Sequence, residues 1–308
     1  MPKRILAFVF ALAPMFAQSH GAVGGPSLGW VFDSAAGQFR AVLGIPGASI
    51  LGDPAPLDAR IRRAAILPGQ DYALISVEGG PASLADLRSG AMRPIPGAIE
   101  DADRILLSPS GTAAILISTR AGRAQALSGL PAGPAVRREL DASGLLAISD
   151  SGDLVLAARD GALDLLSTDA APKRLIVLEQ ISAAAFFDGS SDIAVADRAR
   201  REVYLIRHGE IRMIASSGDG LGEPLSLAAS KGRIVAGFGK SVALIDPAGA
   251  PPVLFECACP VDSLAALDGA NVFGLHAASF EEPLWLLEAA PAAPRIVFVP
   301  AAVERSAQ

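Results

Sequence analysis

The chain has 308 residues, of which 51% are hydrophobic, and it carries 26 Lys and Arg residues against 32 Asp and Glu residues. This hydrophobic content is the opposite of a disordered composition. The acidic balance argues against nucleic-acid binding, which requires a basic surface, and against docking on an anionic membrane by charge.

The first residues have the order of a secretory signal. Lys3 and Arg4 precede an apolar run over residues 5–16, and the small residues Ala17 and Ser19 follow at the −3 and −1 positions of a cleavage site. We expect a signal peptide over residues 1–19. The run is shorter than the roughly 20 residues of a membrane span, although an uncleaved anchor remains an alternative. The protein is expected to be exported, to the periplasm or out of the cell, without a membrane span in the mature chain.

A strand-rich unit then recurs about every 40 residues. Each unit has an apolar run, a turn at a glycine and a second apolar run, and the turn glycines are spaced by 42, 41, 37, 43 and 37 residues: Gly69, Gly111, Gly152, Gly189, Gly232 and Gly269. Such a period with four short strands in each repeat predicts an all-β fold, a single β-propeller of four-stranded blades. We place the propeller at residues 20–302 and a disordered C-terminal tail at residues 303–308.

The number of blades depends on the segment from Trp30 to about Asp53, which holds two strand-like runs before the first full unit. If this segment builds an incomplete blade of its own, the propeller has seven blades, and this arrangement is favoured. If the pair completes the last sheet, the propeller has six. Closure of either kind is expected, because an open row of blades would expose sheet edges.

Two stretches carry a family resemblance. Residues 31–37, with an Asp and a Gly at the ends of a turn, lead to Ile45-Pro46-Gly47, and residues 84–90 lead in the same way to Ile95-Pro96-Gly97; residues 246–249 repeat the first half. This pattern resembles the YVTN-type repeat, which is also seen in lactonase-like propellers. The resemblance implies the fold, and it carries no activity because its motifs are turn chemistry.

Charged residues occur in the connections that lead into the first strand of each unit. In propellers these connections gather at one end of the central channel, where clustered carboxylates can bind a divalent cation such as calcium or act as acid and base. The alternative is a solvated rim of weak ion pairs. The predicted ligand-binding set at this channel mouth is Asp58, Glu100, Asp101, Asp103, Arg104, Asp141, Glu179, Glu223 and Asp262.

The remaining candidates are interpreted as structural. Cys257 and Cys259, the only cysteines, lie two residues apart and so share one face of a strand, which allows either a small local disulfide or two buried thiols. His208 lies in an exposed turn and His276 at a strand end, and no nucleophile elbow accompanies them. Residues 149–153 read as a turn, and residues 216–222 as a loop between blades. No catalytic residue is predicted.

These observations predict an exported, non-catalytic scaffold that binds an unknown protein or small molecule, as a monomer and without a required cofactor. The alternative is a metal-dependent hydrolase of the lactonase-like type, with its site at the acidic mouth of the channel. An electron-transfer quinoprotein is the weakest of the three possibilities, because Trp30 and Trp285 are the only tryptophans and the tryptophan-docking motifs are missing.

Overall fold

The computed structural model describes residues 25–302, except for residues 231, 268–270 and 291–292. The predicted signal peptide and the predicted C-terminal tail lie outside these residues. The regular structure of the described residues consists of β-strands and one short 3-10 turn, η1 (Ser217–Asp219). The all-β prediction is therefore confirmed. Within the part of the chain that the structure covers, no helix is long and apolar enough to cross a membrane.

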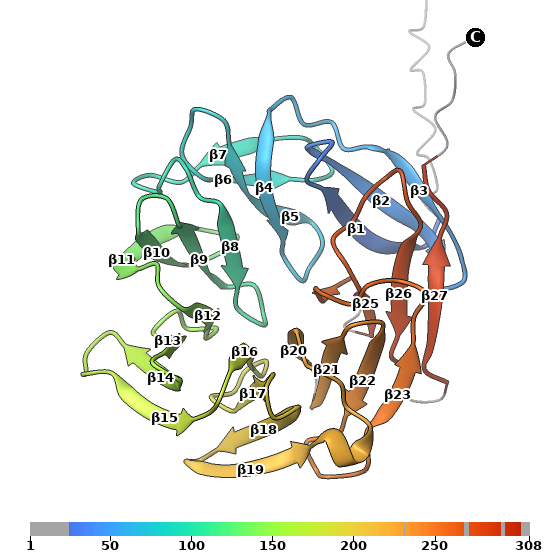
Figure 1. Cartoon of the computed structure of the whole chain (residues 1–308). Coiled ribbons are helices and arrows are strands. Elements are labelled where there is room, and N and C mark those ends of the chain that lie inside the picture. Colours follow the sequence, from blue (N-terminus) through green and yellow to red (C-terminus); the bar gives the residue numbers. More distant parts are fainter. Residues whose placement is uncertain (1–24, 231, 268–270, 291–292, 303–308) are drawn as a thin grey trace, which may run out of the picture.

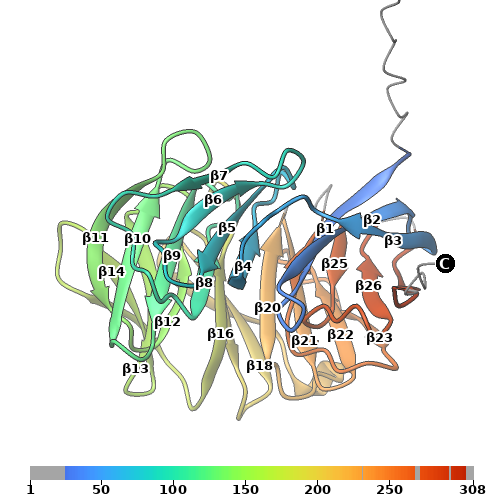
Figure 2. The same ribbon diagram turned by 90° about the horizontal axis from the view of Figure 1, so that it is seen from above.

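Seven antiparallel sheets surround a central opening (Figure 1), which confirms the seven-bladed propeller. Seen at right angles to that view, the strands run from one face of the disc to the other (Figure 2). The strands are, in blade 1, β1 (Ser27–Asp33), β2 (Gln38–Ile45) and β3 (Ala48–Pro54); in blade 2, β4 (Ile61–Ile66), β5 (Tyr72–Val77), β6 (Ser83–Asp86) and β7 (Met92–Pro94); in blade 3, β8 (Arg104–Leu107), β9 (Ala113–Ser118), β10 (Arg123–Ser128) and β11 (Ala135–Asp141); in blade 4, β12 (Leu145–Ile148), β13 (Leu154–Arg159), β14 (Ala162–Ser167) and β15 (Lys173–Val177). Blade 5 has β16 (Ile181–Phe186), β17 (Ile193–Asp197), β18 (Glu202–Arg207) and β19 (Glu210–Ala215); blade 6 has β20 (Ser226–Ser230), β21 (Arg233–Phe238), β22 (Ser241–Ile245) and β23 (Val253–Glu256); and blade 7 has β24 (Ala265–Ala266), β25 (Val272–Gly274), β26 (Leu284–Glu288) and β27 (Arg295–Val299).

The hydrophobic core consists of seven clusters, and each cluster joins two neighbouring blades. Leu74 of blade 2, for example, belongs to the same cluster as Leu116 of blade 3, and Val31 of blade 1 belongs to the same cluster as Leu286 of blade 7. Because both sheet faces are covered in this way, central strands are apolar throughout, and every residue of β9 is buried. The ring is therefore closed on both sides of blade 1.

Blade 1 has three strands, and the missing one is the innermost. The turn after β1 lies at the face where the chain passes between blades, since Ser34 shares a cavity with Arg62 and Asp101. The beginning of β1 lies at the opposite face, where the main-chain amide of Trp30 contacts the first turn of blade 2 at Gln70. β1 thus runs opposite to β4, the inner strand of blade 2, and occupies the place of a second strand.

The connection between β25 and β26 compensates in part for this missing strand. We call residues 275–283 the closing loop; it has nine residues, whereas the corresponding connections of the other blades have two to five. Ala278 forms an isolated parallel bridge with Asp33 at the end of β1. The amide of Phe280 donates to Asp33 Oδ2 at 2.8 Å, and the Arg40 guanidinium lies over the Phe280 ring, 5.2 Å from its centroid. Blade 7 therefore holds blade 1 through side-chain and main-chain contacts.

Gln70 provides a second link across the missing strand. Its Oε1 accepts from the amide of Trp30 at 2.6 Å, and its Nε2 donates to the carbonyl oxygen of Ala266 in β24 at 3.4 Å. Gly29 makes this approach possible, because a Cβ at that position would lie 2.5 Å from Gln70 Oε1. A side chain of blade 2 thus connects blade 1 with blade 7.

The first turns of blades 3, 4 and 5 are joined by Asp150. Its Oδ1 accepts from the amide and the hydroxyl of Ser110 at 2.8 and 2.7 Å, and its Oδ2 accepts from the amide of Gly189 at 2.9 Å. Partial burial alone would raise the pKa of Asp150, but the hydrogen bonds from Ser110 and Gly189 outweigh burial and hold the pKa below its ordinary value. The turn over residues 149–153 is structural, as its sequence indicated.

Candidate functional site: the central channel

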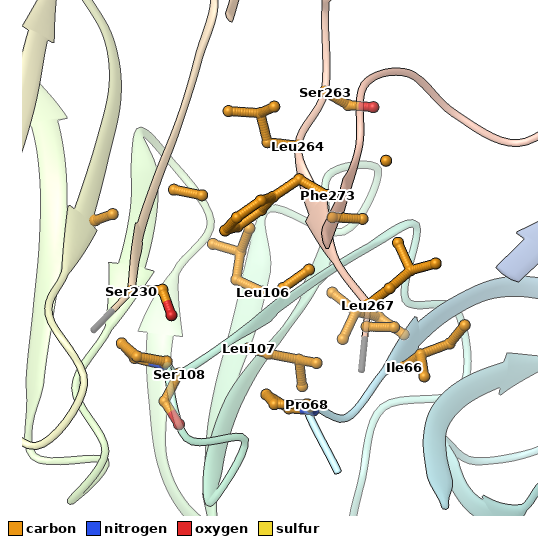
Figure 3. A pocket seen from close by; sticks show the side chains of 18 of the residues that line it. Ile66, Pro68, Leu106, Leu107, Ser108, Ser230, Ser263, Leu264, Leu267 and Phe273 are labelled. Atoms are coloured by element: carbon orange, nitrogen blue, oxygen red, sulfur yellow. The ribbon is translucent and has the colours of Figure 1, made fainter. Parts of the chain in front are cut away.

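The central channel forms a cavity with a volume of about 1120 Å³. The inner strands of blades 2 to 7 form most of its wall. Leucine, alanine and phenylalanine side chains dominate this wall, and serine hydroxyls are interspersed among them (Figure 3): Leu106, Leu107, Ser108, Ser230, Ser263, Leu264 and Phe273. A concave, mostly apolar surface with a few polar groups is the usual form of a ligand pocket, and this volume is slightly above the usual range of about 300–1,000 Å³.

The channel is not symmetric, since it extends outward at blades 1 and 7. In blades 2 to 6 only the inner strand and its adjoining residues line the cavity, whereas Phe273 and Gly274 of β25 and Leu284 of β26 line it in blade 7. Trp30 and Phe32 of β1 line it in blade 1. We call this extension the inner-strand gap; it is the space on the inner edge of β1, between β4 and β24. The missing strand of blade 1 is the physical reason for it.

Three titratable side chains belong to the channel wall: Arg63, Asp188 and His276. Arg63 lies at the face with the inter-blade connections and donates from Nε to the carbonyl oxygen of Asp103 at 3.1 Å. His276 Nδ1 lies 2.8 Å from the carbonyl oxygen of Ala277, and its Nε2 accepts from the amide of Trp285 at 3.3 Å. Both ring nitrogens therefore contact main chain, which assigns His276 a structural role. His208 is exposed in the turn between β18 and β19, also as expected.

A second cavity of about 410 Å³ lies beside the channel mouth. Asp101 and Asp103 line it together with arginines from the start of blade 2, and Glu78 pairs there with Arg60 and Arg62 at 3.7 and 3.2 Å. These ion pairs are exposed and contribute little stability. The positive and negative groups balance, so the cavity has no strong preference for either sign of ligand charge.

None of the nine predicted rim residues lines the central channel. Asp101 and Asp103 are the pair that the structure brings together, and each carboxylate is bound by a hydroxyl from the end of β9. Asp101 Oδ2 accepts from Ser118 Oγ at 2.8 Å, and Asp103 Oδ1 accepts from Thr119 Oγ1 at 2.8 Å. These bonds fix the start of the inner strand of blade 3 to its second strand.

The other rim residues are spread around the ring. Glu179 pairs with Arg200 at 3.6 Å and Glu223 pairs with Arg198 at 3.0 Å. Hydrogen bonds from Ser143 hold the pKa of Asp141 below its ordinary value. The side chains of three acids and one arginine in the set are exposed at their connections or strand start: Asp58, Glu100, Arg104 and Asp262. Among the residues that the structure describes, no three acids, histidines or cysteines come together as potential metal ligands.

Cys257 and Cys259 form a disulfide in the connection between β23 and β24. Both residues are buried against the sheets of blades 6 and 7. The bond joins two residues of the connection inside this interface, so it serves the connection between blades. The loop over residues 216–222 likewise connects two blades, with Ser216 capping η1.

Comparison with known proteins places the fold and nothing more. No protein-family model and no curated protein sequence matches the chain. Similar solved structures include the WD40 repeats of RRP9, with 14% identity, a TM-score of 0.56 and coverage of 80% of this chain and 86% of that one. A functionally unknown protein from Desulfotomaculum acetoxidans has 11% identity, a TM-score of 0.56 and coverage of 89% and 100%, respectively. A computationally designed protein has 14% identity, a TM-score of 0.56 and coverage of 91% and 89%.

These similarities are consistent with a β-propeller and show the fold alone. None of these three structures is named as a YVTN-type or lactonase-like protein. The resemblance of residues 31–37 and 84–90 to that repeat stays a prediction. The two stretches are not equivalent in the propeller, because the first forms the turn between β1 and β2 and the second joins β6 to β7, the third and fourth strands of blade 2.

Sequence reasoning missed the inner-strand gap and the two links that cross it. The signal for the closing loop is its length, since residues 275–283 separate two strands that are joined by much shorter turns elsewhere. Gln70 carried no signal, because a glutamine in a turn is ordinary and its partners Trp30 and Ala266 are 40 and 196 residues away.

Proposed function

We propose that the protein is an exported, non-catalytic binding propeller and that its central channel takes the apolar part of a ligand. The observation that carries this proposal is the channel wall, which is apolar over most of its length and encloses about 1120 Å³. Transfer of apolar surface from water into such a site contributes roughly 25 cal/mol for each Å² buried. A mostly apolar ligand therefore gains more here than a charged one.

The polar groups in the wall set orientation. The hydroxyls of Ser230 and Ser263 and the edges of the inner strands offer hydrogen bonds between the apolar side chains. His276 is engaged with main chain through both nitrogens. These contacts support recognition of a ligand, and they do not assemble a nucleophile with a base.

Export rests on the order of charges and apolar residues over residues 1–19. We propose that the mature chain works as a monomer in the periplasm or outside the cell. Its partner is a small molecule or a segment of a protein. Expression with the native N-terminus, followed by fractionation and N-terminal sequencing, tests this part: cleavage near His20 supports it, and an intact chain in the cytoplasm contradicts it.

Binding is tested with the apolar fluorophore N-phenyl-naphthylamine, whose emission rises in an apolar site. Trp30 lines the channel, so energy transfer from tryptophan to bound probe reports proximity, and W30F separates it from Trp285. L106D places a charge in the wall, and we expect at least a tenfold loss of probe affinity. L254D on the exposed outer strand β23 is the matched control.

A185F provides a second test that does not bury a charge. Ala185 is half-buried and lines the channel, so a phenyl ring there fills part of its volume. We expect weaker probe binding with an unchanged melting temperature. Probe affinity that is the same in the parent protein, L106D and A185F would place the site elsewhere and remove the proposal.

A further inference from the structure

The inner-strand gap has the properties of a binding site for one strand of polypeptide. Resting on the proposed function of the channel, we propose that an extended, apolar peptide segment of a partner protein binds in this gap and adds to β1 as the missing first strand of blade 1. Three features support this inference: the gap, the inner edge of β1 and the hydrogen bonds of Gln70.

The edge of β1 that faces the channel is contacted at two points and has no partner strand along it among the described residues. β1 pairs with β2 along its outer edge, from Ser27 to Asp33. On its inner edge the described residues make two contacts, the isolated bridge from Asp33 to Ala278 and the hydrogen bond from the Trp30 amide to Gln70. A strand edge with unpaired amides and carbonyls is a template for an added strand.

The space beside this edge lies between two neighbouring blades, as the inner strand of any other blade does. Ala64 and Ile66 of β4 line it on the side of blade 2, and Leu267 and Leu284 line it on the side of blade 7. Successive side chains of a strand point to opposite faces, so an added strand would present alternate residues to these two walls. Both walls are apolar, which selects a segment that is apolar at consecutive positions, as the chain's own inner strands are.

Gln70 shows that the gap accommodates an amide. Its carboxamide has the donor and acceptor of a peptide group, and it accepts from Trp30 on one side and donates to Ala266 on the other. A peptide group of an added strand would replace this carboxamide as the acceptor for the Trp30 amide. This pairing of one donor with one acceptor favours a polypeptide over a lipid tail, which has the apolar surface without the amides.

The probe for this proposal is an acetylated and amidated peptide with the sequence Asp-Arg-Ile-Leu-Leu-Ser, which copies residues 103–108 of blade 3. One set of its alternating amides would face β1 and the other would face the open channel. Two further peptides carry N-methyl groups on one set or the other. We expect the parent peptide to bind with one-to-one stoichiometry in calorimetry, one methylated peptide to lose at least tenfold in affinity, and the other to bind within about twofold of the parent.

Ala277→Phe tests the location. Ala277 lines the gap and its side chain is exposed, so a phenyl ring fills the gap without replacing a core residue. The matched control is Ala121→Phe, since Ala121 is exposed in the corresponding connection of blade 3 and is not part of the channel wall. We expect A277F to weaken peptide binding at least tenfold and A121F to change it less than twofold.

The outcomes separate this inference from the proposed function. Binding of the fluorophore without binding of the peptide overturns strand addition and leaves the apolar channel site intact. Equal losses from the two methylated peptides, or equal affinities of A277F and the parent protein, show that backbone pairing in the gap is absent. Failure of both fluorophore and peptide to bind removes the proposed function as well.

Discussion

The carboxylate of Asp33 accepts a hydrogen bond from the main-chain amide of Phe280, 2.8 Å away and 247 residues further along the chain. Asp33 is 4% exposed, and its other oxygen accepts from the amides of Ala35 and Ala36 in the turn after β1. One side chain thus forms a local turn and connects the first blade with the last. In some propellers the first and last strands pair in one sheet and so close the ring. Asp33 contributes to closure here by a hydrogen bond between two separate sheets.

Asp33→Asn isolates the connection between the blades. The amide oxygen of asparagine can still accept from Ala35 and Ala36, but its NH₂ group cannot accept from Phe280. We expect a loss of about 1.5–3 kcal/mol in the free energy of unfolding, because a hydrogen bond to a charged group is lost and a buried amide is left without an acceptor. Denaturant unfolding measures this loss.

The matched control is Asp86→Asn. Asp86 accepts from the amides of Arg88 and Ser89 in a turn of the same kind, and its side chain makes no hydrogen bond to another blade among the described residues. We expect less than about 1 kcal/mol for this change, because the asparagine Oδ1 can still accept from both amides of the turn. Equal losses in the two variants would show that Asp33 acts on its turn and does not stabilise closure.

The repeat could be predicted from the sequence because each blade has the same local pattern of apolar strands around a glycine turn. Glycines such as Gly111 and Gly152 adopt positive φ at equivalent turns, and strands such as β9 are apolar on both faces. The incomplete first blade was the favoured one of two alternatives, and the structure gives it three strands where two strand-like runs were expected. The prediction of seven blades is confirmed for these local reasons.

The place of each strand within blade 1 could not be predicted. Asp33 and Asp86 begin the same five-residue turn, with Gly37 and Gly90 donating to their carbonyl oxygens, yet the two turns lie at different places in their blades. Turn chemistry is local, whereas the place of a strand depends on contacts with Gln70 and the closing loop, far away in sequence. For the same reason the sequence predicted a site at the charged connections and gave no signal for the apolar wall of the channel.

Gln70→Glu tests the link between blades 2, 1 and 7. Glutamate keeps an acceptor for the Trp30 amide but, when ionised, has no donor for the carbonyl oxygen of Ala266. Because this residue is 6% exposed, burial would raise the pKa of the new carboxyl, so the variant should be destabilised at neutral pH. The deficit should shrink as the pH falls through the raised pKa and be lost below the unfolded value of about 4.3, where the protonated acid can donate.

Thermal melting of this variant and the parent across pH 4 to 8 measures the deficit, with the difference between the two proteins as the quantity of interest. Gln70→Leu serves as the control, since it removes both hydrogen bonds and cannot titrate. A deficit of Q70E that is constant with pH, as expected for Q70L, would mean that the donor to Ala266 contributes nothing.

Asp150→Asn is predicted to loosen the first turns of blades 3, 4 and 5. The pKa of Asp150 is lowered in the folded protein, so its contribution to stability is present above the unfolded pKa of about 3.9 and is lost as the pH falls through the lower folded value. We expect a deficit of about 1–2 kcal/mol for D150N at neutral pH, at the lower end for charged hydrogen bonds because the side chain is partly exposed. Below about pH 4 the deficit should narrow.

The control for this prediction is Asp160→Asn, in an exposed two-residue turn of the same blade. Asparagine tolerates the positive φ of that position, so little change is expected. Urea unfolding at pH 7 and pH 3.5 compares the two variants. A D150N deficit that is as large at pH 3.5 as at pH 7 would contradict the role of the ionised carboxylate.

The Cys257–Cys259 disulfide is predicted to contribute modestly to stability. The two residues are separated by 2 positions, and the loop-closure relation gives about 1.5 kcal/mol for a ring this short. We expect reduction, or the double variant C257A/C259A, to lower the melting temperature by a few degrees and to leave probe binding in the channel unchanged. Intact mass after alkylation of the folded and unfolded protein checks the bond, and two alkylated thiols without reductant would contradict it.

Calcium is predicted to leave the melting temperature unchanged. The acids of the rim are engaged individually, Asp101 and Asp103 by the hydroxyls of Ser118 and Thr119, and Glu179 and Glu223 by arginines. A cation would have to displace these partners and draw together carboxylates from separate blades.

A site filled to 100 times its dissociation constant adds about 2.7 kcal/mol, which would raise the melting temperature of a chain this size by several degrees. Melting in chelator and in millimolar calcium therefore distinguishes the two proposals for the rim: a flat response fits a binding propeller with a structural rim, and a clear rise that D101N/D103N removes would favour the metal-dependent hydrolase.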